Sequence, residues 1–292
     1  MSRMHTFALL AATAGVALVP PARAADPIDV VATFSILGDM VARVGGDRVA
    51  VTTLVGPNGD AHVYQPSPGD AQAILDADLV IVNGLGFEGF LDRLMSASGY
   101  TGPIVTAAAA IRPIEIDGDH EVGAAEHGDD DDDHAAEADG RDHGPLDPHA
   151  WQDVANGIAY VGAISEGLCG VDPEGCAAFE ANAEAYRTEL AALDADIRAR
   201  IDAVPEDRRT IITSHDAFGY FARAYDVRFI SPQGVSTDSE ASARDVAELI
   251  EQIRETGVRV IFVESIADPR LIQRIAAETG AGVGGALFSD AL

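Results

Sequence analysis

The alternation of short apolar strand-like runs with amphipathic helical runs constrains the fold of this chain most strongly, and it occurs in two blocks. The first block predicts strands over residues 29–33, 49–55, 79–83 and 104–106, and helices over 36–44, 69–76 and 88–96. The second predicts strands over 209–213, 228–231, 258–263 and 284–288, and helices over 218–225, 243–256 and 269–278. This order of elements is typical of α/β folds with parallel sheets.

A long helical stretch separates the two blocks. Residues 176–204 contain neither proline nor glycine and are rich in alanine, glutamate, leucine and arginine. We therefore predict a single helix over 173–204, with about 30 residues and a length of about 45 Å. We expect this helix to join an N-terminal α/β lobe over residues 25–172 to a C-terminal α/β lobe over residues 205–292.

Local signals predict two helix starts and one loop. Asp147 followed by Pro148 predicts an N-cap and a first helical turn ahead of the apolar run that continues to Leu168. Ser242 and Asp245 have the spacing of a capping box for the helix over 243–256. Residues 115–145 lack apolar periodicity and carry many charges, so we expect a solvated loop there.

The first 24 residues have the organisation of a secretory signal peptide. A basic start at Arg3 is followed by an apolar run over 7–19 and by the small-residue ending from Ala22 to Ala24. An apolar run of about 13 residues is too short for a membrane-spanning helix, which needs roughly 20. We predict cleavage near Ala24 and a mature chain in the periplasm. Because no cysteine lies near this position, we expect no lipid anchor.

The two cysteines agree with an oxidising compartment. Cys169 and Cys176 enclose the turn-rich segment GVDPEG between two helical patterns. In an oxidising space they would close a small loop by a disulfide bond, which adds modest stability. Two free buried thiols and a thiolate metal site are the alternatives.

The charged residues exclude several classes of partner and chemistry. The net charge of the chain is −29. It argues against nucleic acid and against an anionic membrane surface. Much of it is local, because residues 115–142 hold 13 acidic residues and one arginine. All 19 basic residues are arginine, which excludes mechanisms that need a Schiff-base lysine or a phosphate-loop lysine.

The eight histidines indicate where a ligand site lies. His5 belongs to the predicted signal peptide, and four others lie in the charged loop. These four are His120, His127, His134 and His143. The remaining three, His62, His149 and His215, each occur where a strand or loop leads into the next element. Ligands of open α/β sheets bind beyond the carboxyl ends of the strands, so we expect these three side chains to meet in one crevice.

Three histidines in one crevice point to a metal site. Imidazole suits zinc and other late divalent metals, and a closed zinc site has four donors in a tetrahedral arrangement. Neither cysteine lies at a comparable junction, so a carboxylate is the expected fourth donor. Asp290, at the end of a predicted strand, is the first candidate, and Glu264 is the second.

Five motifs, taken in order, resemble those of one family. They are GDAHVYQPSP, DPHAW, SHDAFGYFARAYD, STDSEASARDVAELIEQIRETGVRVIFVE and GGALFSD. Their spacing over residues 26–292 resembles the cluster A-I, or TroA/ZnuA-like, periplasmic metal-binding proteins of ABC transporters. The resemblance implies two α/β lobes joined by one rigid helix, with the metal site in the cleft between the lobes.

The resemblance also implies the ligands, the cargo and the partners. The ligands would be His62 and His149 from the N-terminal lobe, and His215 and Asp290 from the C-terminal lobe. Manganese-type members have a glutamate where this chain has His215, so three imidazoles and one carboxylate favour Zn²⁺ as the transported ion. The implied protein is a monomer, not an enzyme, that delivers zinc to a membrane permease, with a periplasmic metallochaperone as a second partner.

The chain departs from the resembled family at its end. Members of that family continue beyond the final aspartate with a further helix, whereas this sequence ends two residues after Asp290. The resemblance therefore implies either a fragment or a short C-terminal lobe. With little chain after it, Asp290 is expected to be the least firmly held of the four ligands.

Three other functions are compatible with the same residues. One is a manganese- or iron(II)-binding protein of the same fold. Another is a periplasmic zinc hydrolase, since three histidines and an open position also describe catalytic zinc, although the chain lacks an HExxH motif. The last is a metal buffer in which the four loop histidines bind zinc weakly, because ordering a loop costs entropy. A solvated spacer without a role is the simplest interpretation of that loop.

Overall fold

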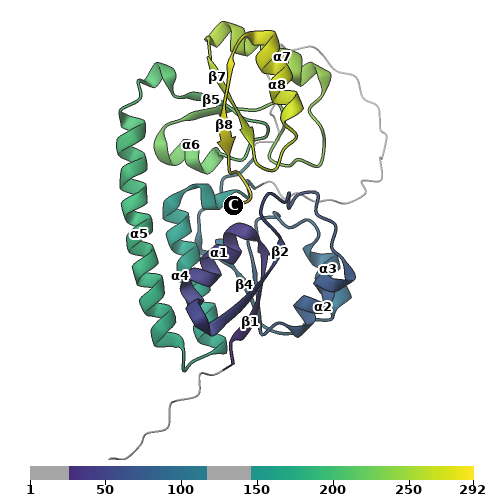
Figure 1. The fold of residues 1–292 in the computed structure, drawn as a ribbon, viewed down its shortest axis with the longest axis vertical. Helices are drawn as coiled ribbons and strands as arrows, with labels where there is room; N and C mark the ends of the chain where they lie inside the picture. The colour runs from purple at the N-terminus through teal and green to yellow at the C-terminus, as the bar shows by residue number, and fades with distance from the viewer. Residues whose placement is uncertain (1–25, 117–145) are drawn as a thin grey trace, which may run out of the picture.

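The computed structural model describes residues 26–116 and 146–292, so the predicted signal peptide and most of the charged loop lie outside the described residues. The four loop histidines also lie outside them. Within the described residues, the chain forms two α/β lobes joined by one long helix, as predicted (Figure 1).

The N-terminal lobe contains a four-stranded sheet in the order β2-β1-β3-β4, and all its neighbouring strands are parallel. Its strands are β1 (Ile28–Phe34), β2 (Val49–Val55), β3 (Leu79–Val82) and β4 (Ile104–Thr106). Its helices are α1 (Ser35–Gly45), α2 (Pro68–Asp76), α3 (Leu91–Ser98) and α4 (Val154–Val171). Helices α1 and α4 lie on one side of the sheet and α2 and α3 on the other (Figure 1). Covered on both faces, the central strands β1 and β3 are almost continuously apolar.

Helix α4 is the core helix of this lobe. It is long and apolar enough to cross a membrane by length and composition alone. In the structure, however, it packs against α1 and α5, and the side chains of Tyr160, Ile164 and Leu168 are fully buried in the lobe. Burial in the core accounts for the apolar composition of this helix.

The start of α4 differs from the prediction. The helix begins at Val154 and not at Pro148, because Asp153 is its N-cap and its carboxylate accepts the backbone N–H of Ala155 at 2.9 Å. A short 3₁₀ turn over Ala150–Gln152 precedes the cap. The prediction that Asp147 caps this helix is therefore wrong, and Asp147 has a different role in the site described below.

The C-terminal lobe repeats the same organisation with a second four-stranded parallel sheet, in the order β6-β5-β7-β8. Its strands are β5 (Thr210–Ile212), β6 (Arg228–Ile230), β7 (Val260–Glu264) and β8 (Gly282–Leu287). Its helices are α6 (Gly219–Tyr225), α7 (Ala243–Thr256) and α8 (Pro269–Thr279). The capping box predicted at the start of α7 is present, because Ser242 and Asp245 exchange side-chain and backbone hydrogen bonds.

Helix α5 (Cys176–Asp202) is the predicted connecting helix and runs along both lobes (Figure 1). At its start, the predicted disulfide bond joins Cys176 to Cys169 near the end of α4. Phe179 is fully buried in the N-terminal lobe. Near its other end, the Arg198 guanidinium donates to the backbone oxygen of Ala224, at 2.8 Å, in α6 of the C-terminal lobe. The helix is therefore attached to both lobes.

Candidate metal centre

Four side chains from distant parts of the sequence converge between the two lobes. They are the four residues predicted as ligands, namely His62, His149, His215 and Asp290. Each offers a donor atom, and all four donor atoms lie within 4.8 Å of one another. His62 is 7% exposed, and the other three are at most 1% exposed. The cluster is thus enclosed in the folded protein.

Each lobe contributes two of the four side chains, and three of them follow the carboxyl end of a parallel strand. His62 lies in the loop after β2, His215 in the loop after β5, and Asp290 just after β8. His149 lies in the segment that leads into α4. Because carboxyl ends of parallel strands share one edge of a sheet, the two sheets present their ligand-bearing edges to the same cleft.

The spacing of the donor atoms suits a tetrahedral ion. The Nε2 atoms of His62 and His149 are 3.3 Å apart. Asp290 Oδ2 lies 3.3 Å from Nε2 of His62 and 3.4 Å from Nε2 of His215, and Oδ1 lies 3.6 Å from Nε2 of His149. Donors bound to zinc at its usual bond lengths of about 2.0–2.2 Å lie about 3.3–3.6 Å from one another in a tetrahedron.

Asp147 holds His149 in place. Its Oδ1 atom accepts the backbone N–H of His149 at 2.9 Å and lies 2.8 Å from Nδ1 of the same residue. An acceptor at Nδ1 places the proton there and leaves Nε2 free to bind metal. Sequence reasoning missed this role of Asp147, although the Asp-x-His spacing carried the signal.

Glu264, the second candidate for the fourth donor, lies behind His215 instead. Its Oε2 atom is 2.6 Å from Nδ1 of His215. Its other oxygen, Oε1, accepts the backbone N–H groups of Ser214 at 2.6 Å and His215 at 2.9 Å. The carboxylate therefore fixes both the backbone and the ring of His215, and Asp290 is the carboxylate that joins the three Nε2 atoms.

The charges within the cluster depend on one another in the metal-free protein. Burial lowers the pKa of His62. Burial also opposes a charge on His215, but Asp290 and Glu264 outweigh it and hold the pKa of His215 well above its ordinary value. Burial likewise opposes a charge on Asp290, yet His149 and His215 hold the pKa of that carboxyl well below its ordinary value. The charges of Asp290 and His215 thus favour each other in the metal-free protein, and a cation that binds here competes with the proton.

Aromatic rings line the N-terminal side of the cluster. The ring of Phe87 lies 5.1 Å from that of His62, and the ring of Trp151 lies 5.4 Å from that of His149, measured between centroids. Trp151 also donates its Nε1–H to the backbone oxygen of Ser289 at 2.9 Å, and so holds the residue next to Asp290. On the other side of Asp290, the backbone N–H of Leu292 donates to Oγ of Ser35 at 3.0 Å. Residues on both sides of Asp290 are thus anchored to the opposite lobe.

Two α/β lobes that enclose a buried donor cluster define a solute-binding protein, which takes up its ligand between its lobes. Residues 30–292 match the family model described as zinc-uptake complex component A, periplasmic (ZnuA), and the chain belongs to this family. The family model describes a periplasmic component of a metal-uptake complex, and a relative from Streptococcus sanguinis is named as a substrate-binding lipoprotein of a metal ABC transporter.

Individual relatives agree with this assignment. The manganese-binding lipoprotein MntA of Halalkalibacterium halodurans is 30% identical over 285 residues, which cover 98% of this chain and 87% of that protein. The iron-binding protein YfeA of Yersinia pestis is 29% identical over 287 residues, which cover 98% and 85%. The structure of the periplasmic zinc-binding protein TroA from Treponema pallidum matches with a TM-score of 0.77 and 31% identity, over 92% of this chain and 90% of that one.

Proposed function

We propose that the chain is a high-affinity zinc-binding protein that captures Zn²⁺ in the periplasm and delivers it to the membrane permease of an ABC transporter. The observation that carries this proposal is the buried set of three imidazole Nε2 atoms and one carboxylate, spaced 3.3–3.6 Å apart where their separations are measured. The ligand assignment to His62, His149, His215 and Asp290 belongs to the same proposal.

The donor types support zinc over manganese. Imidazole nitrogen suits zinc, whereas manganese favours an octahedral set rich in oxygen. The names of the relatives include manganese, iron and zinc, so the comparisons support a divalent metal without distinguishing among these ions. A manganese- or iron(II)-binding protein is therefore the second candidate, and the relatives named for those metals are the observation that favours it.

The number of donors supports capture of the ion over catalysis. A catalytic zinc site has three protein ligands and one open position for water or substrate. Here Asp290 fills the fourth position of a tetrahedral set, and its buried oxygens face the Nε2 atoms of the three histidines at 3.3–3.6 Å, with no N–H or O–H of another described residue bonded to them. Such buried acceptors are rare in proteins unless another group, such as a cation, satisfies them.

Metal analysis of the purified protein, followed by competition between Zn²⁺ and Mn²⁺, tests the proposal. We expect about one equivalent of tightly held zinc and a weaker affinity for manganese, in line with the general order of divalent metal affinities. Copurification with manganese or iron, together with tighter binding of that ion than of zinc, would instead support the second candidate.

A further inference from the structure

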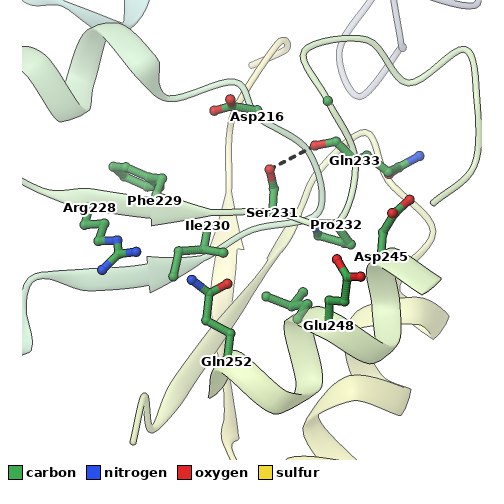
Figure 2. A pocket seen from close by; sticks show the side chains of 12 residues that line it. Asp216, Arg228, Phe229, Ile230, Ser231, Pro232, Gln233, Asp245, Glu248 and Gln252 are labelled. Carbon is green, nitrogen blue, oxygen red and sulfur yellow. Dashed lines mark hydrogen bonds between the residues drawn. The ribbon is translucent and has the colours of Figure 1, made fainter. Parts of the chain in front are cut away.

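The loop between β6 and α7, residues 231–242, contacts the ligand-bearing loops of both lobes. Within its own lobe, the backbone oxygen of Gly234 accepts the N–H of Asp216, which directly follows the ligand His215, at 3.1 Å. Figure 2 shows the start of this loop facing Asp216, with the Ser231 hydroxyl bonded to the backbone oxygen of Gln233. The contact with the other lobe is made by Thr237.

Asp60 connects Thr237 to the other lobe and to the site. Its Oδ1 atom accepts the backbone N–H of the ligand His62 at 2.9 Å. Its Oδ2 atom accepts the hydroxyl of Thr237 at 2.6 Å, across a sequence separation of 177 residues. One carboxylate therefore positions a ligand of the N-terminal lobe and, at the same time, holds a loop of the C-terminal lobe.

This hydrogen bond lies beside a cleft that borders the loop of His215. The cleft has a volume of about 490 Å³, and its lining includes Asp60, Thr237 and Ser214, the last of which directly precedes His215. Charged side chains of both signs also line it, namely Glu240, Asp268, Arg270 and Arg274. Because the four donors are buried, a metal ion entering from this cleft must pass the contact between Asp60 and Thr237.

Two of the other contacts between the lobes are more deeply buried. Trp151 Nε1 donates to the backbone oxygen of Ser289, and the Tyr220 hydroxyl donates to the backbone oxygen of Asp147, and both bonds are buried. Asp60 and Thr237, in contrast, are both half-buried side chains. Water can replace a hydrogen bond of this kind at low cost when it opens. The bond between Asp60 and Thr237 is therefore the easiest of these three to break and remake.

We propose that the Asp60–Thr237 hydrogen bond is a latch that controls how fast metal enters and leaves the site. When it is formed, Thr237 keeps the 231–242 loop against the N-terminal lobe and Asp60 keeps the backbone of His62 in place. When it opens, the loop moves away and the adjoining cleft extends to the donors. Thr237 and Asp60 are positioning residues that act through His62 and the loop, and the inference rests on the proposed function.

A valine at position 237 removes the hydroxyl and keeps the shape of the side chain. In Thr237→Val we expect the rates of Zn²⁺ association and of release to a chelator to rise together, by about three- to tenfold, as for the loss of one charge-assisted hydrogen bond. The dissociation constant should change less than either rate. Stopped-flow measurements on the full chain provide both rates, and a titration provides the dissociation constant.

Three variants separate a latch from general damage. Thr237→Ser retains a hydroxyl and should restore rates close to those of the wild type. Ser239→Ala changes an exposed side chain of the same loop and should leave both rates unchanged. Asp60→Ala removes the acceptors of both His62 and Thr237, so it should weaken equilibrium binding as well as speed release. Adding Thr237→Val to Asp60→Ala should then have no further effect.

The outcomes distinguish the latch from the function on which it rests. If the wild-type protein holds no Zn²⁺, both proposals are wrong. If the wild type holds Zn²⁺ tightly and Thr237→Val exchanges it at the wild-type rates, the latch alone is wrong. Faster release with unchanged association, and a matching loss of affinity, would also overturn the latch, because it would show that Thr237 stabilises the bound state without controlling access.

Discussion

The Nδ1 atom of His215 lies 2.6 Å from Oε2 of Glu264, deep in the C-terminal lobe and on the side of the ring that faces away from Asp290 Oδ2. The same glutamate accepts two backbone N–H groups of the loop that carries His215. Burial raises the pKa of Glu264, but the His215 ring and these N–H groups outweigh it and hold that pKa below its ordinary value. An ionised Glu264 thus orients the ring and increases its affinity for a cation.

Glu264→Gln should weaken zinc binding by about 10- to 100-fold, the usual cost of removing the partner of a metal-ligating histidine. The amide keeps the size of the side chain but loses the charge that favours Nδ1–H. Glu251→Gln, on an exposed position of the same lobe, is the matched control and should bind like the wild type. Competition with a chelator of known affinity measures both, and equal affinities in the two variants would contradict the role of Glu264.

Asp290→Ala should weaken zinc binding more than Glu264→Gln does, by more than about 100-fold. It removes a proposed metal donor, whereas Glu264→Gln changes only the partner of one. Cobalt(II) substitution reports the geometry, since the absorption of a tetrahedral site differs from that of a site with added water. If zinc affinity is unchanged and a metal-bound water is present, the open site of a hydrolase becomes the better interpretation. Asp202→Ala, at an exposed position at the end of α5, serves as the control.

Zinc affinity should fall as the pH falls. Although burial opposes it, Asp290 and Glu264 raise the pKa of His215 well above its ordinary value, so a proton competes for this ring in the metal-free protein up to a higher pH than for an ordinary histidine. Zinc must displace that proton, which makes the logarithm of the affinity rise by about one per pH unit until the raised pKa is reached. His62, whose pKa is lowered by burial, binds as the neutral ring.

Calorimetry in buffers with different ionisation enthalpies counts the released protons, and titrations between about pH 6 and pH 8 provide the slope. Release of about one proton at neutral pH is the expected result. An affinity that does not change over this range would argue against coordination by three histidines.

Deletion of residues 117–145 tests whether the charged segment binds metal. We expect one tight zinc site to survive, because the four proposed ligands and the carboxylates that orient them lie outside this segment. Any weaker sites contributed by His120, His127, His134 and His143 should disappear. Calorimetric titration of both proteins separates the two classes of site, and loss of the tight site on deletion would show that the proposed ligand set is wrong.

The sequence predicted the architecture because periodicity is local information. Buried parallel strands such as β3 have continuous apolar sequences, and the capping box of Ser242 and Asp245 indicates where α7 begins. The start of α4 was less predictable, because two aspartates, Asp147 and Asp153, precede it and either can cap a helix. Only the folded structure shows that the carboxylate of Asp147 pairs with the ring of His149 and so does not cap the helix.

The convergence of the four side chains at the candidate site was predictable, and the residues that hold them in place were not. His62, His149 and His215 stood out because few histidines lie outside the charged segment and the predicted signal peptide. The pairing of Glu264 with His215 and of Asp60 with Thr237 joins residues 49 and 177 positions apart. No periodicity or local spacing specifies such contacts, since the first depends on the packing of the C-terminal lobe and the second on how the two lobes are packed against each other.

The four proposed ligands are divided equally between the lobes, with His62 and His149 on one and His215 and Asp290 on the other. Neither half alone is more than a bidentate chelator, and the high effective concentration of the second pair exists only while the lobes are together. A bound ion therefore also holds the two lobes together. A permease that pulls the lobes apart need not compete for the metal with stronger donors, because separation itself converts one strong chelate into two weak ones.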